Sequence, residues 1–85
     1  GNPSPLYVYR DLKVLSAKAI GNEGKHLLLN VYDGKNSIRC IGFNLGHYQK
    51  LLSTGSKIDI ICSMEENSWN NIKSIQLNIK DIKIR

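Results

Sequence analysis

The stretch HLLLNVYDGKNSIRCIGF, residues 26–43, decides which fold this sequence can adopt. Leu27, Leu29 and Val31 alternate with polar or aromatic residues, which is the period of a β-strand with one apolar face. Asp33-Gly34 is a residue pair that tolerates positive φ, so a turn is predicted before a second strand begins. The stretch therefore predicts a β-hairpin with one face toward a core. Its other face is either a ligand platform or simply a soluble surface.

The size and charge of the chain limit what it can be. Its 85 residues make one small domain, or part of one, with a thin core. With 41% hydrophobic and 22% charged residues it is not a disordered tail, and its apolar runs are too short to span a bilayer. The formal charge of +5 favours a polyanionic partner, provided that the fold gathers the basic residues on one face. Residues 1–10 lack the apolar core of a signal peptide, so we expect a cytoplasmic domain with no membrane partner.

The two cysteines, Cys40 and Cys62, both lie in apolar, strand-like runs. Without a CxxC motif or clustered histidines, they do not predict a zinc site. We expect two buried free thiols in a reducing cytoplasm; a disulfide between neighbouring strands is the alternative.

Outside the hairpin, the pattern predicts three more strands and one short helix. A parity change of the apolar positions near Val14-Leu15 predicts a bulge in the first strand. Asn44 can cap the helix and Gly55 can end it. We expect residues 1–5, GNPSP, to be a linker or the end of a preceding domain, and residues 6–85 to form the domain itself. Its predicted elements are a strand (6–20), a loop (21–25), the hairpin, a helix (44–54), a strand (57–64), a loop (65–71) and a strand (72–84).

This order of elements predicts an all-β fold, a five-stranded OB-fold barrel with one short helix between strands 3 and 4. Closing five short strands into a barrel removes exposed edges, and the helix seals one end. An SH3-like barrel is the nearest alternative, but its helical insertion normally falls later. An OB barrel binds ligands across the outer face of strands 2 and 3, flanked by the loops between strands 1 and 2 and between strands 4 and 5.

Cations for phosphates and flat side chains for bases are what single-stranded nucleic acid needs from such a face. Trp69 could instead be a lid packed on the barrel end, and His26 an ordinary surface residue. Tyr32 could merely pair across the hairpin with Arg39. Phe43 is assigned to the core, as is Ile75. The candidate DNA-binding residues are Lys25, His26, Asn30, Tyr32, Lys35, Arg39, Trp69 and Lys73.

Four short motifs, in order along the chain, resemble the carboxy-terminal OB domain of bacterial RecJ exonucleases. The opening GNPSP (residues 1–5) is similar to a GNPEP stretch in that family. The other three are GKHL at 24–27 with CIGF at 40–43, NSWN at 67–70, and QLNIKDI at 76–82. Asn71 stands where the family often has Gly, but Asn also accepts a left-handed turn. Cys40 stands where Ala is commoner, and Leu28 and Asn30 stand where basic or polar residues are frequent.

The resemblance implies a piece of a single-strand-specific 5′→3′ DNA exonuclease of recombination and repair. In that family the divalent metal, Mg²⁺ or Mn²⁺, is held by Asp/His clusters in upstream catalytic domains. Here the four aspartates lie on different predicted elements and no two carboxylates are placed to share a metal. We therefore expect no catalytic and no metal-binding residues, and no cofactor, in this piece.

Two classes of function remain open. The first is a module that binds single-stranded DNA and orients it for the catalytic domains of the same parent chain. The second is a protein-interaction module that docks on those domains or on a repair partner. An enzyme seated on the barrel itself would need a carboxylate cluster that the spacing does not offer.

Overall fold

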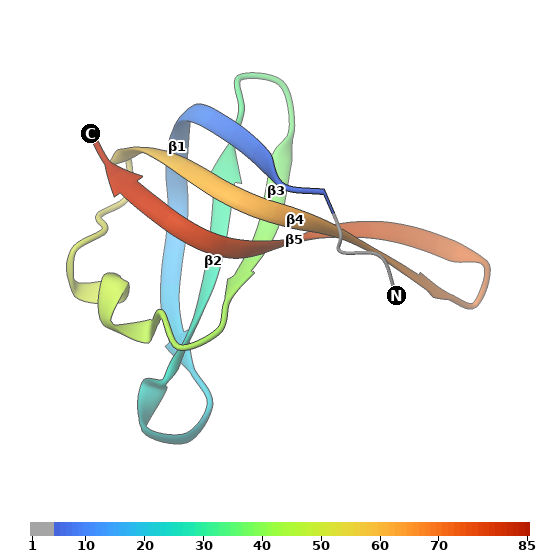
Figure 1. Ribbon diagram of the computed structural model, residues 1–85, viewed down its shortest axis with the longest axis horizontal. Coiled ribbons are helices and arrows are strands. Elements are labelled where there is room, and N and C mark those ends of the chain that lie inside the picture. Colours follow the sequence, from blue (N-terminus) through green and yellow to red (C-terminus); the bar gives the residue numbers. More distant parts are fainter. Residues whose placement is uncertain (1–4) are drawn as a thin grey trace.

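The computed structural model describes residues 5–85, apart from the side chains of Asn67 and Trp69. Most of the predicted linker, residues 1–4, lies outside the described residues. Five strands wrap around one core, and a long hairpin projects from one side of the barrel (Figure 1). The elements are β1 (Tyr7–Ile20), η1 (Asn22–Gly24), β2 (His26–Tyr32), β3 (Ser37–Gly42), η2 (Gly46–Lys50), β4 (Lys57–Trp69) and β5 (Ile72–Ile84).

The strands close into a barrel in the order β1-β2-β3-β5-β4, which confirms the predicted OB-fold. All neighbouring strands are antiparallel except β3 and β5, which pair in parallel at Cys40↔Leu77 and Ile41↔Asn78. β1 is long enough to pair with β4 through its first half and with β2 through its second half. The predicted bulge is confirmed, because the register between β1 and β2 shifts between Val14 and Ser16.

The core is built from the inward-facing residues of all five strands. Leu27, Leu29 and Val31 are fully buried, as their alternation predicts. Cys40 and Cys62 are buried free thiols, and burial raises the pKa of the Cys40 thiol to about 12. Both thiols therefore behave as small apolar side chains in this core.

The turn of the β2–β3 hairpin forms at the predicted place. Gly34 has a φ of 98°, which a glycine adopts without strain. The carboxylate of Asp33 accepts the backbone N–H groups of Asn36 and Lys35 at 2.7 and 2.8 Å, and these bonds lower the pKa of Asp33. The turn is thus fixed by its own side chain, an Asx turn.

The predicted α-helix over residues 44–54 is shorter and tighter than expected. The structure has a 3₁₀-helix, η2, and Asn44 does not cap it but takes a positive φ of 64° before it. The segment still seals one end of the barrel, since Leu52 is buried and Leu45 and Tyr48 pack against the core. A stretch this short gains little from α-helical hydrogen bonding, so core contacts decide its shape.

The predicted loop at 65–71 is wrong. β4 runs on to Trp69 and pairs with β5 as far as Trp69↔Ile72, leaving only Asn70 and Asn71 in the turn. Both asparagines have positive φ, 50° and 64°, as a type I′ hairpin turn requires. The residues of β4 after Ser63 and the residues of β5 before Leu77 form the hairpin that projects in Figure 1; this hairpin is called the arm below.

The carboxylate of Asp59 holds together three distant parts of the chain. Its Oδ1 accepts Arg85 Nε at 2.7 Å and the backbone N–H of Asp11 at 2.8 Å. Asp11 has a φ of 57° and lies where the register between β1 and β4 shifts. The Arg85 guanidinium first, and then the Asp11 N–H, lower the pKa of Asp59. The bend of β1 therefore depends on an ionised carboxylate.

We expect Asp59→Asn to lower the thermal midpoint at pH 7, since the amide oxygen is a weaker acceptor for both donors. The pKa of Asp59 is lower in the folded than in the unfolded chain, so its contribution is complete above about pH 4 and is lost as the pH falls through the folded value. Thermal unfolding followed by circular dichroism at pH 7 and at about pH 3 measures this. If the difference in thermal midpoint between variant and parent is as large in acid as at pH 7, the Asp59 carboxylate does not have this role.

Candidate nucleic-acid interface

The outer face of β2 and β3 forms a ladder of cross-strand pairs. Residues 26, 28, 30 and 32 point away from the core, because their neighbours at 27, 29 and 31 are buried. The observed register places Ser37 opposite Tyr32, Arg39 opposite Asn30, and Ile41 opposite Leu28. The second half of β1 widens this face by a third strand. The name "β2–β3 face" is used below for these outward positions on β1, β2 and β3.

Asn30 and Arg39 occupy the middle of the β2–β3 face, as the sequence predicts. They are a directly paired couple, and Arg39 is exposed. The Asn30 Nδ2 donates to the Ser16 hydroxyl on β1 at 3.1 Å, which fixes the amide orientation. Arg39 makes no hydrogen bond or ion pair among the contacts of the described residues, so its guanidinium is free to bind a phosphate or stack on a base.

The assignment of Phe43 to the core is wrong. Phe43 follows β3 on the outward parity and is 58% exposed. Its ring meets the His26 ring edge to face, with centroids 5.3 Å apart and an interplanar angle of 77°. The His26 Nδ1 accepts the backbone N–H of Asn44 at 3.1 Å, which holds the imidazole in place. The face therefore ends in a fixed pair of flat side chains.

Tyr32 marks the opposite end of the β2–β3 face. Its hydroxyl donates to the Gly34 carbonyl at 3.0 Å, so the ring lies against the hairpin turn while remaining 38% exposed. Lys35 is exposed in this turn. Flat side chains thus stand at both ends of the face, with Arg39 between them.

A groove of about 490 Å³ connects the β2–β3 face with the arm. It opens where β3 leaves β5, since the two strands pair only at Cys40 and Ile41. Met64 and Ile75, two exposed apolar side chains at the base of the arm, form one wall. Ile75 is 56% exposed, so its predicted place in the core is wrong. The groove is lined by Tyr9, Asn30, Ser37, Ile38, Arg39, Met64, Ile75 and Leu77.

The remaining predicted residues lie around the face rather than on it. Lys25 precedes β2 and is exposed at the His26 end. Lys73 lies on the arm, where its Nζ is 3.7 Å from Glu66 Oε1, so a neighbouring carboxylate offsets its charge. Trp69 is the last residue of β4 at the tip of the arm, and its side chain lies outside the described residues. The structure therefore brings together His26, Asn30, Tyr32 and Arg39.

Two lysines on β1 belong to this face and escaped the sequence analysis. Lys13 pairs with Tyr32 and Lys18 with Leu28, so both point outward beside β2. Strand parity shows that both lysines lie on the outside of the first strand. Because the bulge at Val14-Leu15 changes that parity, the sequence does not tell which neighbouring strand each lysine lies beside. With Arg39 they line the two borders of the face with cations.

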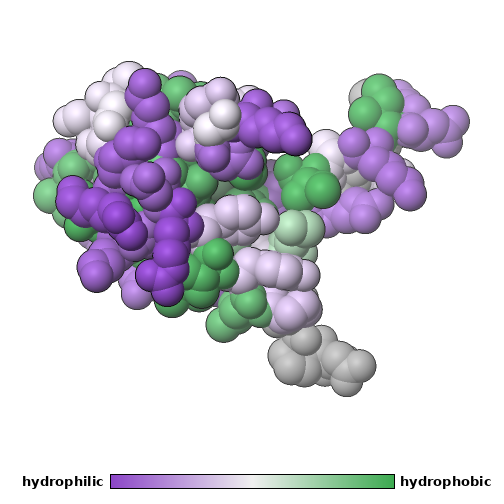
Figure 2. Space-filling model, turned by 90° about the horizontal axis from the view of Figure 1, so that it is seen from above, coloured by the Kyte–Doolittle hydropathy of each residue, from purple (hydrophilic) through white to green (hydrophobic). Residues whose placement is uncertain are grey.

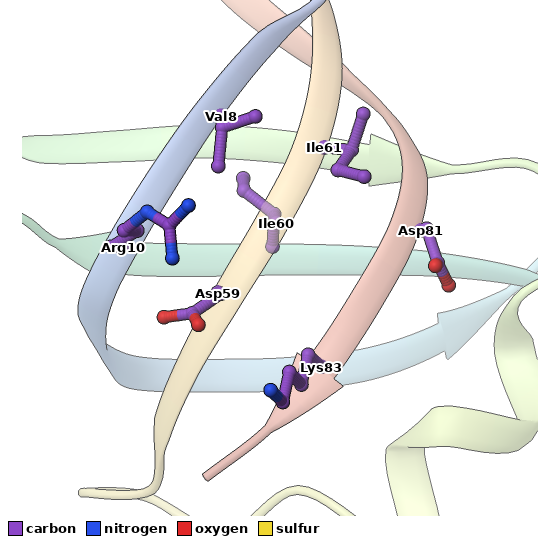
Figure 3. Close-up of a pocket in the computed structure, with 7 residues that line it drawn as sticks. All are labelled: Val8, Arg10, Asp59, Ile60, Ile61, Asp81 and Lys83. Atoms are coloured by element: carbon purple, nitrogen blue, oxygen red, sulfur yellow. The ribbon is translucent and has the colours of Figure 1, made fainter.

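The charges differ between opposite walls of the barrel. None of the described outward positions on the second half of β1, on β2 or on β3 carries a carboxylate. On the outer side of β1, β4 and β5, a pocket of about 260 Å³ has Asp59 and Asp81 beside Arg10 and Lys83 (Figure 3). That pocket is balanced in charge, so the β2–β3 face is the better site for a polyanion.

The surface seen from above is hydrophilic over much of the barrel, and the arm stands clear of the body (Figure 2). Hydrophobic side chains interrupt it both on the body and on the arm. Among the exposed ones, Ile72 on the arm is 66% and Val8 on β1 is 56% accessible.

No described helix is long and apolar enough to cross a membrane. The described residues also contain no group of three potential metal ligands of the His, Cys, Asp and Glu types.

The fold resembles solved structures of low sequence identity. A putative aspartyl-tRNA synthetase from Leishmania major Friedlin superposes with a TM-score of 0.68 at 16% identity, over 95% of this chain and 17% of that one. The aspartyl-tRNA synthetase of Entamoeba histolytica gives a TM-score of 0.75 at 11% identity, over 95% and 18%. At such identities the likeness shows the shared barrel.

Sequence comparison places the chain within a family. A family model described as the RecJ OB domain matches residues 1–81. The single-stranded-DNA-specific exonuclease RecJ of Bacillus subtilis (strain 168) is 32% identical over 83 residues, which are 98% of this chain and 11% of that protein. The chain thus spans about a tenth of the curated relative it matches. A five-stranded barrel with this strand order and a match along nearly its whole length together show that the chain belongs to the RecJ OB domain family.

Proposed function

We propose that this domain binds single-stranded DNA on its β2–β3 face and orients it for the catalytic domains of a RecJ-like 5′→3′ exonuclease. The observation that supports this most is the Asn30–Arg39 couple on a face without carboxylates, with flat side chains at both ends. Arginine suits this position because one guanidinium can both bind a phosphate and stack on a base. The name of the Bacillus subtilis relative gives the class of substrate.

The wider setting is part of the same proposal. The parent chain would be a nuclease of DNA repair and recombination in the cytoplasm, with Mg²⁺ or Mn²⁺ held by its catalytic domains. The role proposed for the barrel itself is to bind and orient DNA, with no catalytic residue of its own.

Binding of the 85-residue chain to a labelled oligothymidylate at two salt concentrations tests the proposal. Phosphate contacts release counterions, so the logarithm of the affinity should fall linearly with the logarithm of the salt concentration, by about 0.7 per neutralised phosphate of a single strand. An affinity independent of salt, or no binding at low salt, would count against a nucleic-acid site.

A protein-interaction module is the second candidate, favoured by the exposed apolar side chains of the arm. Ile72 and Ile75 are 66% and 56% accessible, and Met64 is 38% accessible. Such side chains suit docking on the catalytic domains of the parent chain or on a repair partner. Apolar docking depends little on salt. Titration of a protein partner at the same two salt concentrations should therefore give nearly equal affinities, unlike the titration of the oligothymidylate.

We expect Arg39→Ala to weaken oligonucleotide binding about tenfold at low salt and to reduce the salt slope by about one phosphate contact. The barrel should stay folded, because Arg39 is exposed and bonds to no other described side chain. Fluorescence anisotropy gives the affinity, and a thermal melt gives the stability. The matched control is Arg10→Ala on the opposite wall, which should leave the affinity unchanged. Equal binding by the Arg39 variant and the parent would remove Arg39 from the site.

A further inference from the structure

A second basic hollow lies at the end of the barrel, outside the β2–β3 face. Its volume is about 450 Å³, and it opens between the β1–β2 loop and η2. Lys25 and Lys50 bring two cations to it, against one carboxylate from Glu23. This hollow, called the end pocket below, is lined by Ala19, Glu23, Gly24, Lys25, Gly46, His47, Gln49 and Lys50.

The walls of the end pocket are held together by backbone contacts. The Gly46 N–H donates to the Lys25 carbonyl at 2.9 Å, which ties η2 to the β1–β2 loop. A side chain at position 46 would overlap the carbonyl oxygen of Gly24, so only glycine permits this approach. The two walls therefore have a fixed separation before any ligand binds, which reduces the entropy lost on binding.

The end pocket is continuous with the β2–β3 face. Lys25 lines the pocket, and the next residue, His26, forms the end of the face with Phe43. The Asn44 N–H, just after Phe43, donates to the His26 Nδ1 at 3.1 Å. A strand that leaves the face over His26 and Phe43 therefore meets Lys25 first and the end pocket next.

The chemistry of the end pocket suits a nucleotide unit. Two ammonium groups attract a phosphodiester, and Gln49 offers both a donor and an acceptor to a base edge. The exposed His47 ring rests against Tyr48, with centroids 4.6 Å apart, and Tyr48 itself packs on the core. The imidazole is thus a supported flat surface, and the volume lies within the range of small-ligand sites.

We infer that the end pocket is a second subsite for single-stranded nucleic acid, which takes the part of the strand that runs past His26 and Phe43. The inference rests on the proposed function. It adds the path of the bound strand, which continues around the barrel end toward η2. The groove at the arm borders the same face beside Asn30 and Arg39.

Two substitutions that remove charges of opposite sign test the end pocket in the 85-residue chain. Lys50→Gln should weaken binding of a thymidine oligomer of about 15 nucleotides several-fold and lower its salt slope by about one contact. Glu23→Gln removes the one carboxylate among the described residues that line the pocket and should strengthen the same binding. An oligomer of about 6 nucleotides, which the β2–β3 face alone can hold, should bind both variants like the parent.

The control is Lys83→Gln, which removes an equal charge from the opposite wall. It should leave the affinity for both oligomers unchanged. If Lys50→Gln and Glu23→Gln also change neither affinity while Arg39→Ala weakens both, the end pocket is not a subsite and the proposed function stands. If the parent binds neither oligomer at low salt, the proposed function fails and the end pocket fails with it.

Discussion

Phe43→Ala is expected to cause the largest loss of affinity of any single substitution on the β2–β3 face. Stacking of one base on an aromatic ring contributes about 1–3 kcal/mol, which corresponds to roughly 5- to 150-fold in affinity. Phe43 is 58% exposed and already held edge to face by His26, so a base can stack without first ordering the ring. Titration of a labelled oligothymidylate against the variant and the parent measures the loss.

The stability of the Phe43 variant should change little, because more than half of the side chain is accessible to solvent in the folded chain. Phe43→Trp serves as the conservative partner, since it keeps a flat surface and should retain most of the affinity. Ile84→Ala on β5 is the control away from this face, where an apolar side chain that is 40% exposed is removed. Unchanged affinity in Phe43→Ala would remove the ring from the binding site, whatever the melt shows.

Leu29→Ala should have the largest effect on stability. Leu29 is fully buried in the middle of β2, and truncation of such a residue costs about 2–5 kcal/mol. A chain of this length has a total stability on the order of 4–13 kcal/mol, so a large share would be lost. Urea unfolding followed by circular dichroism gives the difference in the free energy of unfolding.

The neighbouring residue supplies a matched control. Leu28 points to the outer face and is partly exposed, so Leu28→Ala removes the same atoms from the same strand at a much smaller cost in stability. It should instead weaken oligonucleotide binding, because Leu28 and Ile41 form an apolar cross-strand pair on the β2–β3 face. Equal destabilisation by the two substitutions would mean that the register of β2 is wrong.

The barrel could be predicted because its signals are local and repeated. Alternation in residues 27–31 separates core from surface residue by residue, and the observed burial follows it. The bulge near Val14 is visible in the sequence because the apolar positions change parity there. The couple Asn30–Arg39 follows from strand parity and the turn position alone, so half of the predicted site residues lie on one face.

The errors fall where pairing partners, rather than local pattern, decide the structure. Residues 65–71 show no alternation and are polar except for Trp69, so their pattern predicts a loop; pairing between β4 and β5 makes most of them strand. Asn70-Asn71 was the overlooked signal, since two adjacent asparagines suit the two positive φ values of a type I′ turn. Phe43 was misplaced because Gly42 ends β3, so the strand parity beyond it could not be assumed.

The arm separates two requirements of a small domain: a constant core, and a reach that suits the neighbouring molecules. β4 loses its β1 neighbour beyond Cys62, and β5 has no β3 partner before Leu77, so the strand residues between 65 and 76 pair only with each other. Adding or removing two residues from each strand at the tip would change the reach of the arm by about 7 Å while every core contact of the barrel stays as it is. Related chains can therefore vary in arm length at little cost to folding, and so adapt to neighbours at different distances.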